Sequence, residues 1–264
     1  QTPFSGNDYW KLLTKAGLDH SNEYTAMVYF GTNPNYNFDE FYRSFRPDMR
    51  LWGFTGYYYS RERAFFMPWW CAAHRYGGFC WYNAASWTFN LVDIPSLEIT
   101  RDARDLKESL EASKLLDGLG KLTLAWDWAK RDVALYYSHD AMLLSYALGQ
   151  ETTMGEIRDS GPMHDYMYSR QGIQYAVEEL LYQHDFVAPE QMLAGKLGDY
   201  RILFMPRILA MSDAEVAAVK AFVKAGGTVV ADVLPGDYDE LGVKRAANPF
   251  AADEIAVLGR NFCE

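Results

Sequence analysis

A carboxylate and a set of aromatic and amide residues lie in or just after segments of this sequence that read as β-strands. The carboxylate is Glu62, a few residues beyond the apolar segment 49–56. The aromatic and amide residues are Trp52, Tyr57, Trp81, Asn83 and Trp87. Aromatic planes stack on the C–H faces of a sugar ring, and polar groups beside them hydrogen-bond its hydroxyl groups. These residue types therefore indicate a site for a neutral, polyhydroxylated ligand.

Glu62 by itself would supply only half of the catalytic apparatus of a glycosidase. Most glycoside hydrolases use two carboxyl groups, one to protonate the leaving oxygen and one to act as nucleophile or base. Asp39, Glu40 and Asp48 fall on or beside a predicted helix that leads away from the strand ends, so we expect them on the surface. Glu62 also stands between Arg61 and Arg63. A structural carboxylate paired with arginine is therefore the competing interpretation.

Composition and short motifs argue against several other classes of function. The formal net charge of −10 disfavours a nucleic-acid partner, which would bind a basic surface. No run of about 18 apolar residues occurs, so no membrane span is predicted. The 3 cysteines lack metal-binding spacing, and no glycine-rich phosphate motif follows a strand, so we expect no metal and no cofactor. Cys71 and Cys80 lie in apolar surroundings and are predicted to be buried free thiols.

The second half of the chain alternates between predicted strands and helices. The strands are 132–138, 200–206 and 228–233, and the helices are 170–186 and a segment that Ser212 and Glu215 begin with a capping box. Ile173, Val177, Leu180 and Leu181 are expected on one face of the first helix, and Val216, Val219, Phe222 and Val223 on one face of the second. Such alternation predicts right-handed βαβ units and a parallel sheet.

Little in this second half indicates catalysis. The turn after 200–206 reads MPRILAMS, without the cysteine of an amidotransferase or the serine of a hydrolase elbow. His139 and Asp140 follow the strand 132–138, at the end of an open sheet where ligands usually bind. A pair that caps the loop is the alternative interpretation of these two residues.

The first half shows the same alternation. Predicted strands are 25–31, 49–56 and 77–83, and predicted helices are 38–45, 65–77 entered near Pro68, and 103–116 capped by Thr100. This pattern predicts three successive βα units. In a (β/α)8 barrel the active site is built at the carboxyl ends of the strands, where Glu62 and the aromatic set fall.

Three stretches of the second half resemble the trimerisation domain of family 42 glycoside hydrolases, the bacterial β-galactosidases. They are VALYYSHDA, GIQYAVEELLYQHDF and LGDYRILFMPRILAMSDAEVAAVKAFVKAGGTVVADV. The most specific parts are a strand ending in MPRILAMSDAEV and a helix ending in AGGTVV. In that family the domain follows a barrel whose last strand has an aromatic-rich end, which GGFCWYNAASW is similar to.

The resemblance implies a two-part α/β chain. Residues 1–125 would be the last strands of a (β/α)8 barrel. Residues 126–264 would be a flavodoxin-like, amidotransferase-like domain that assembles the chain into a homo-oligomer such as a trimer. It further implies retaining hydrolysis of a β-galactoside or similar carbohydrate, with Glu62 as nucleophile and Trp52, Tyr57, Trp81, Asn83 and Trp87 lining the sugar subsite. A complete barrel takes about 250 residues, so a complementing barrel segment is also expected. The alternative is a noncatalytic protein that binds carbohydrate or oligomerises.

Overall fold

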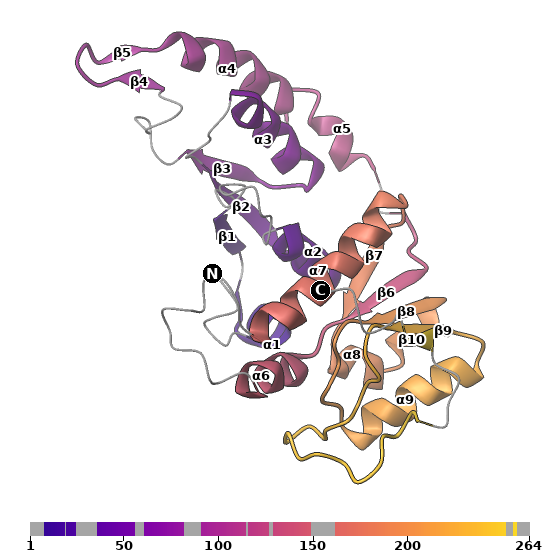
Figure 1. Cartoon of the computed structure of the whole chain (residues 1–264). Coiled ribbons are helices and arrows are strands. Elements are labelled where there is room, and N and C mark those ends of the chain that lie inside the picture. The colour runs from indigo at the N-terminus through magenta and orange to yellow at the C-terminus, as the bar shows by residue number, and fades with distance from the viewer. Residues whose placement is uncertain are drawn as a thin grey trace. The chain divides into compact units, whose positions relative to one another are not determined.

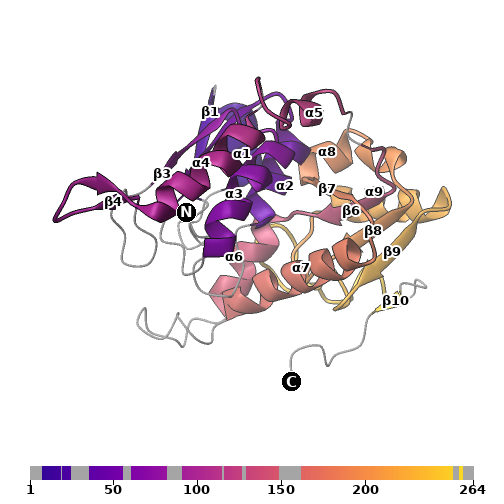
Figure 2. The ribbon, with the colours of Figure 1, turned by 90° about the horizontal axis from the view of Figure 1, so that it is seen from above.

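The computed structural model of the chain describes residues 8–18, 20–24, 36–55, 61–81, 91–114, 116–126, 129–148, 162–251 and 256–257. The chain divides into two compact units. The first unit is Lys11–Trp128 together with residues 1–5, and the second is Ala129–Glu264 together with residues 6–10. Each unit combines helices with parallel strands, as Figures 1 and 2 show. The predicted α/β class is confirmed.

The first unit contains a three-stranded parallel sheet in the order β1-β2-β3, formed by His20–Tyr24, Arg50–Thr55 and Gly78–Trp81. The register pairs Trp52 of β2 with Asn22 on one side and with Gly78 on the other. The helices before residue 129 are α1 (Tyr9–Lys15), α2 (Tyr36–Phe45), α3 (Arg61–Ala73), α4 (Arg101–Ser113) and α5 (Lys121–Leu124). A hairpin of β4 (Val92–Asp93) and β5 (Glu98–Ile99) precedes α4.

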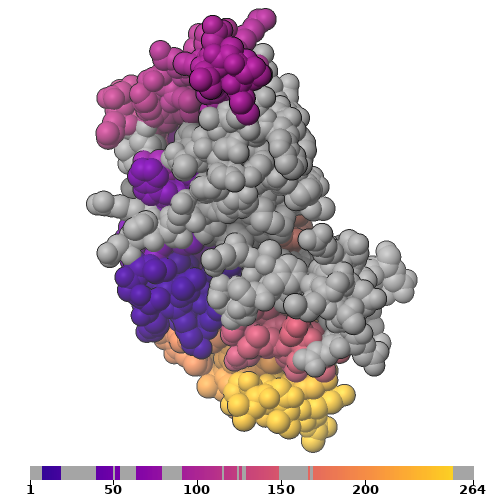
Figure 3. Space-filling model, turned by 90° about the vertical axis from the view of Figure 1, so that its left-hand side faces the viewer, coloured from indigo at the N-terminus to yellow at the C-terminus, as the bar shows by residue number. Residues whose placement is uncertain are grey.

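The core of the first unit is built from apolar residues at helical spacing. Phe41 and Phe45 lie one turn apart on α2, are both buried, and stack with ring centroids 5.8 Å apart. Met67 and Cys71 form a similar buried pair on α3. The hairpin is different, because Ile94, Leu97 and Ile99 are all exposed and the hairpin projects from the surface in Figures 1 and 3.

Most of the predicted elements of the first unit are present, but the predicted start of α3 was wrong. α3 begins at Arg61 and carries Pro68 in its interior, whereas we expected the proline near the entrance. Pro68 is buried, so packing outweighs the loss of one helical hydrogen bond at this position. β1 ends at Tyr24 as far as it is described, and the predicted strand 25–31 lies outside the described residues. Thr100 caps α4 as expected, with its Oγ1 accepting a hydrogen bond from the Ala103 N–H at 3.1 Å.

The second unit contains a parallel sheet in the order β10-β9-β8-β6-β7. Its strands are β6 (Val133–Tyr136), β7 (His184–Val187), β8 (Ile202–Met205), β9 (Thr228–Ala231) and the two-residue β10 (Ala256–Val257). Its helices are α6 (His139–Leu148), α7 (Pro162–Glu179), α8 (Pro189–Leu193), the 3-10 helix η3 (Lys196–Asp199) and α9 (Asp213–Lys224). α6 packs against α7 and α8 against α9, as right-handed crossovers to either side of β6 require (Figure 1).

β6 is buried on both faces, whereas in β8 and β9 buried residues alternate with more exposed ones. All four residues of β6 are buried, and Leu135 and Leu203 are fully so. Parallel sheets covered on both faces have continuous apolar strands for this reason. Val216, Val219 and Phe222 of α9 join the same core, whereas Val223 is half-exposed and was wrongly expected there.

The predicted capping box of α9 is confirmed and extends into the core. The Ser212 N–H donates to Glu215 at 2.6 Å, and the Glu215 N–H donates to the Ser212 hydroxyl at 3.3 Å. Glu215 is only 4% exposed and also accepts a hydrogen bond from the Tyr136 hydroxyl. Burial, followed by the charge of Glu215, raises the pKa of Tyr136 well above its ordinary range. The capping carboxylate thus ties α9 to β6.

Two parts of the second unit differ from the prediction. Residues 139–148 form α6, a helix that was not predicted, and the predicted helix 170–186 stops at Glu179, so that its last residues belong to β7. Leu181 takes a left-handed conformation with φ 62°, and the Tyr182 N–H donates to the Val177 carbonyl at 3.1 Å, which ends the helix. Leu180 and Leu181 are consequently exposed, with 91% of Leu181 accessible, and do not lie on the apolar face.

None of the helices in the described ranges combines the length and apolar character that crossing a membrane requires.

Candidate functional site

The two strands that carry or precede the predicted sugar-binding residues, β2 and β3, end side by side. Thr55, the last residue of β2, is paired in register with Trp81, the last residue of β3. In the sequence, Tyr57 follows the end of β2, and Asn83 and Trp87 follow the end of β3. Tyr57, Asn83 and Trp87 lie outside the described residues, as does the side chain of Trp81.

Trp52 is the predicted subsite residue whose side chain the structure describes. Leu51 and Gly53 are buried, and Trp52 between them is 47% exposed, because side chains alternate between the two faces of a strand. Its indole lies over the neighbouring strand. A Cβ atom on Gly78 would meet the Cζ3 and Cη2 atoms of Trp52 at 3.1 and 3.2 Å. The absence of a side chain at Gly78 therefore lets an exposed aromatic plane lie against the sheet.

Glu62 is the second residue of α3, seven positions beyond the end of β2 at Thr55. Its backbone is described, but its side chain lies outside the described set. A carboxylate in the first turn is favoured by the positive end of the helix dipole. This position suits both a nucleophile and a purely structural carboxylate.

The other carboxylates of this region differ in their surroundings. Asp48 is exposed as predicted, and hydrogen bonds from Arg46 lower its pKa. Glu40 is largely buried beside Arg43, contrary to the expectation of a surface residue. The described residues contain no group of three or more His, Cys, Asp or Glu side chains arranged to hold a metal ion.

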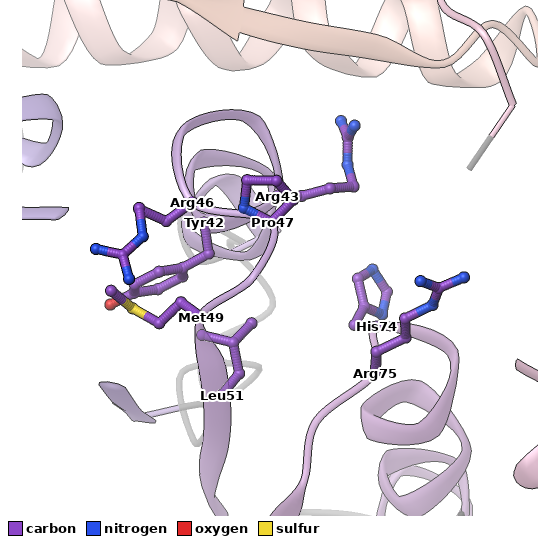
Figure 4. A pocket seen from close by; sticks show the side chains of 8 residues that line it. All are labelled: Tyr42, Arg43, Arg46, Pro47, Met49, Leu51, His74 and Arg75. Carbon is purple, nitrogen blue, oxygen red and sulfur yellow. The ribbon is translucent and has the colours of Figure 1, made fainter. Parts of the chain in front are cut away.

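A basic hollow that the sequence did not indicate lies at the opposite end of β2. It is a cavity of about 70 Å³ lined by Tyr42, Arg43, Arg46, Pro47, Met49, Leu51, His74 and Arg75. Figure 4 shows Arg43 and Pro47, at the end of α2, on one side and His74 and Arg75, at the end of α3, on the other. Met49 and Leu51 lie between them. The available signal was a set of basic residues in or directly after the last turns of two consecutive helices.

Arg75 occupies a strained position at the end of α3. Its φ is 59°, its N–H donates to the Ala72 carbonyl at 3.1 Å, and the next N–H, of Tyr76, donates to the Cys71 carbonyl at 2.8 Å. This pair of bonds is the Schellman ending of a helix, in which the left-handed residue is usually glycine. A side chain there costs on the order of 1 kcal/mol.

The other basic groups of the hollow are held in fixed orientations. Arg46 donates to the Leu13 carbonyl at 2.9 Å and to Asp48 at 3.0 Å, and Arg43 forms an ion pair with Glu40. His74 stacks on Trp70 with ring centroids 3.9 Å apart, and its Nδ1 lies 2.9 Å from the Trp70 carbonyl. The side chains that line the hollow are therefore preorganised.

The carboxyl edge of the second sheet is held together by hydrogen bonds. The Ser138 hydroxyl accepts from the Ala141 N–H at 3.1 Å, so Ser138 caps α6, and neither His139 nor Asp140 does. The Tyr166 hydroxyl donates to the Ser138 carbonyl at 3.0 Å, and burial raises the pKa of Tyr166. Beyond β8, Arg207 has φ 43° and donates its N–H to Asp232 at 2.7 Å. A ligand at His139 and Asp140 stays a prediction.

No protein-family model matches the chain, and no curated protein does. Solved structures do resemble it. A GH42 β-galactosidase from G. stearothermophilus matches with a TM-score of 0.65 and 16% identity over 91% of this chain and 36% of the other. A β-galactosidase from Bacillus circulans sp. alkalophilus matches with a TM-score of 0.64 and 17% identity over 93% and 37%. One from Rahnella sp. R3 matches with a TM-score of 0.62 and 15% identity over 90% and 36%.

The chain thus resembles part of the GH42 enzymes in fold and spans about a third of their length. At these identities the likeness concerns the fold alone.

Proposed function

We propose that this chain is the carboxyl-terminal part of a family 42-like glycoside hydrolase. The observation that carries the proposal is the likeness in fold over 91% of the chain to a GH42 β-galactosidase of which it spans 36%. In this proposal residues 1–125 supply the last strands of a (β/α)8 barrel, and residues 126–264 form a flavodoxin-like assembly domain. The parallel β1-β2-β3 sheet followed by the second parallel sheet supports this order of parts.

The proposed reaction is retaining hydrolysis of a β-galactoside or similar glycoside. Glu62 attacks the anomeric carbon and forms a glycosyl ester, while a carboxylic acid from another part of the barrel protonates the departing oxygen. That second group, then acting as base, activates a water molecule, which cleaves the ester and regenerates Glu62. Trp52, Tyr57, Trp81, Asn83 and Trp87 line the sugar subsite, where the half-exposed indole of Trp52 offers an aromatic plane.

The second unit has the role of assembly in this proposal. It holds the barrel portion in a homo-oligomer, a trimer in the family that the sequence resembles, and a complementing barrel segment completes the active site. The carboxyl edge of its sheet is occupied by a cap and by hydrogen bonds to Ser138 and Asp232, which suits a structural role.

Turnover of a nitrophenyl β-galactoside tests the proposal. The 264-residue chain alone is expected to be inactive, because it contributes one of the two carboxyl groups. Mixed or fused with a segment that completes the barrel, it should hydrolyse the substrate with retention at the anomeric carbon, which NMR detects. Turnover by the chain alone, or no turnover by the completed barrel, would contradict the proposal.

A noncatalytic protein that binds carbohydrate is the second candidate. The observation that favours it is the place of Glu62 in the first turn of α3, where a carboxylate has a structural benefit. A completed barrel that binds galactoside but does not turn it over would favour this second candidate.

Replacing Trp52 by Ala tests the sugar subsite separately from catalysis. We expect the affinity for a β-galactoside to fall about fivefold, since an aromatic stacking contact contributes roughly 1 kcal/mol beyond its buried area. Stability should change little, because the indole is 47% exposed. Titration calorimetry on the completed barrel measures the affinity. Trp69→Ala, on α3 and 37% exposed, is the matched control and should bind like the unmodified protein; equal affinity in both variants would remove Trp52 from the subsite.

A further inference from the structure

We infer that the outer face of α4, with the apolar groups at its two ends, is a surface on which a second copy of this chain binds with its own α4 running in the opposite direction. The face consists of four charged residues, Arg101, Arg104, Glu108 and Glu111. They are spaced by three and four residues, so they share one side of the helix. All four are exposed, whereas Leu106 and Ser113 on the other side are buried.

The charges are ordered so that this charged face complements itself. Its amino-terminal half is positive and its carboxyl-terminal half is negative. In two antiparallel copies the positive half of each therefore lies opposite the negative half of the other. Arg101 and Glu111 are both five residues from Leu106, and Arg104 and Glu108 are both two residues from it. A single two-fold axis beside Leu106 thus brings both kinds of pair to the same level, as an isologous contact requires.

The same order of charges brings little benefit to a single α4. The helix dipole favours acidic residues in the first turn and basic ones in the last. α4 begins with two arginines and one aspartate, and the described residues of its last turn include Glu111 but no basic residue. The ion pairs within the chain, Arg101 with Asp105 at 3.8 Å and Lys114 with Glu111 at 2.5 Å, are exposed and therefore weak. Two antiparallel copies would add four ion pairs across the contact.

Exposed apolar side chains lie at both ends of the charged face. They are Ile94, Leu97 and Ile99 on the β4–β5 hairpin before α4, and Leu116, Leu119 and Leu122 in or near α5 after it. Figures 1 and 2 show the hairpin and α5 at opposite ends of α4. The two-fold axis beside Leu106 places Leu97 of one copy near the level of Leu116 of the other. Contact between the two ends would remove apolar surface from water.

The hairpin holds its apolar side chains in a defined arrangement. The Leu97 N–H donates to the Asp93 carbonyl at 2.8 Å, and Arg104 of α4 donates to the Ile99 carbonyl at 2.8 Å. Leu97 has φ 57°, a conformation that suits glycine or asparagine, yet its side chain is 79% exposed. The strain is therefore not repaid by burial within the chain, and contact with a second copy would give this leucine a function.

This contact surface belongs to the first unit. It is separate from the second unit, to which the proposed function assigns assembly, and the inference does not depend on that function.

Sedimentation velocity of the full chain over a range of concentrations tests the inference. The unmodified chain should self-associate reversibly, and added salt should weaken the association. Arg101→Glu with Arg104→Glu makes the charged face wholly negative, and Glu108→Lys with Glu111→Lys makes it wholly positive. Each double variant should raise the dissociation constant by roughly tenfold or more, because like charges then face one another. An equal mixture of the two should associate again.

The variant that carries all four substitutions is the decisive control. Its charge order is reversed but again complements itself, so it should self-associate like the unmodified chain and should not bind the unmodified chain. It keeps the formal net charge of −10, because two arginines become acidic and two glutamates become basic. It also lacks the hydrogen bond from Arg104 to the hairpin. Restored association would therefore exclude net charge and loss of this bond as causes. The reversed order suits the helix dipole, so α4 should not be lost.

Leu97→Asn tests the apolar ends of the surface. It relieves the left-handed strain and should raise the melting temperature, yet weaken self-association by roughly tenfold, because the change occurs twice in each dimer. Leu181→Asn is the matched control, since Leu181 has φ 62° and is 91% exposed in the second unit. It should gain stability and leave self-association unchanged.

Three results would overturn the inference. The first is an unmodified chain that stays monomeric, which would mean that the surface faces a different partner or none. The second is an association that both double variants leave unchanged, which would assign assembly to another surface such as the second unit. The third is an association that the double variants abolish but that neither their mixture nor the fourfold variant restores.

Discussion

Glu62→Gln is expected to abolish nearly all glycosidase activity of the completed barrel. The amide keeps the size and most hydrogen bonds of the carboxylate but cannot form the glycosyl ester, so turnover of a nitrophenyl β-galactoside should fall by about a thousandfold or more. Binding of galactoside should be retained, because Trp52 and the other subsite residues are untouched. Steady-state kinetics and calorimetry together measure the two quantities.

A second variant at the same position tests the chemical role itself. In Glu62→Ala, azide fits the vacated space and can attack the anomeric carbon, so added azide should restore turnover and give a glycosyl azide. A structural carboxylate would show no such rescue. Glu98→Gln, on the exposed β4–β5 hairpin, is the control and should retain full activity. A Glu62→Gln variant that keeps more than a tenth of the activity would transfer the nucleophile role to another residue.

Gly227→Ala is expected to destabilise the second unit by about 2 kcal/mol, within the range for forcing extra atoms into a packed core. Gly227 joins α9 to β9, and a Cβ atom there would lie 2.3 to 2.5 Å from three ring atoms of Phe222. Phe222 is buried in the core and has little room to retreat. The free energy of unfolding in urea, followed by far-ultraviolet circular dichroism, should show the loss.

Gly172→Ala is the opposite control in the same unit. Gly172 lies within α7, is exposed, and has no neighbouring atom within 4 Å of the place that a Cβ would occupy. Alanine there should therefore stabilise by up to about 1 kcal/mol through helix propensity. If both substitutions shifted stability in the same direction, the close contact between Gly227 and Phe222 would not be the determining factor.

The elements that could be predicted from the sequence have strong local signals. Ser212 and Glu215 begin α9, Thr100 begins α4, and the apolar strands β6, β8 and β9 lie where the pattern predicted them. In each case the residues that determine the boundary are close together in the chain. Capping boxes and short apolar runs are local features, and they keep their meaning in any fold.

The elements that could not be predicted depend on distant partners. The sequence of α6 is apolar on most sides of the helix and has no clear helical period, so no helix was predicted there. β7 has the short sequence HDFV and becomes a strand because β6 lies beside it. Leu180 and Leu181 have the spacing of a buried helical face. The left-handed turn at Leu181 ends the helix, however, and both side chains are exposed.

The candidate site, too, could be predicted from the sequence only in part. Its residue types predicted an aromatic plane, and Trp52 is such a plane, but the contact between its indole and Gly78 depends on the pairing of β2 with β3. The basic hollow joins residues 42–51 to His74 and Arg75 only through the fold. Glu62, Tyr57, Trp81, Asn83 and Trp87 stay predictions for a sugar site.

The labelling rate of the buried Cys71 thiol can report how often the first unit opens around α3. Cys71 is buried as predicted, with 3% exposed, so a thiol reagent can reach it only when this part of the first unit opens. Mass spectrometry resolves its labelling from that of Cys80 and Cys263. The rate at saturating reagent then equals the frequency of that local opening, measured without unfolding the second unit.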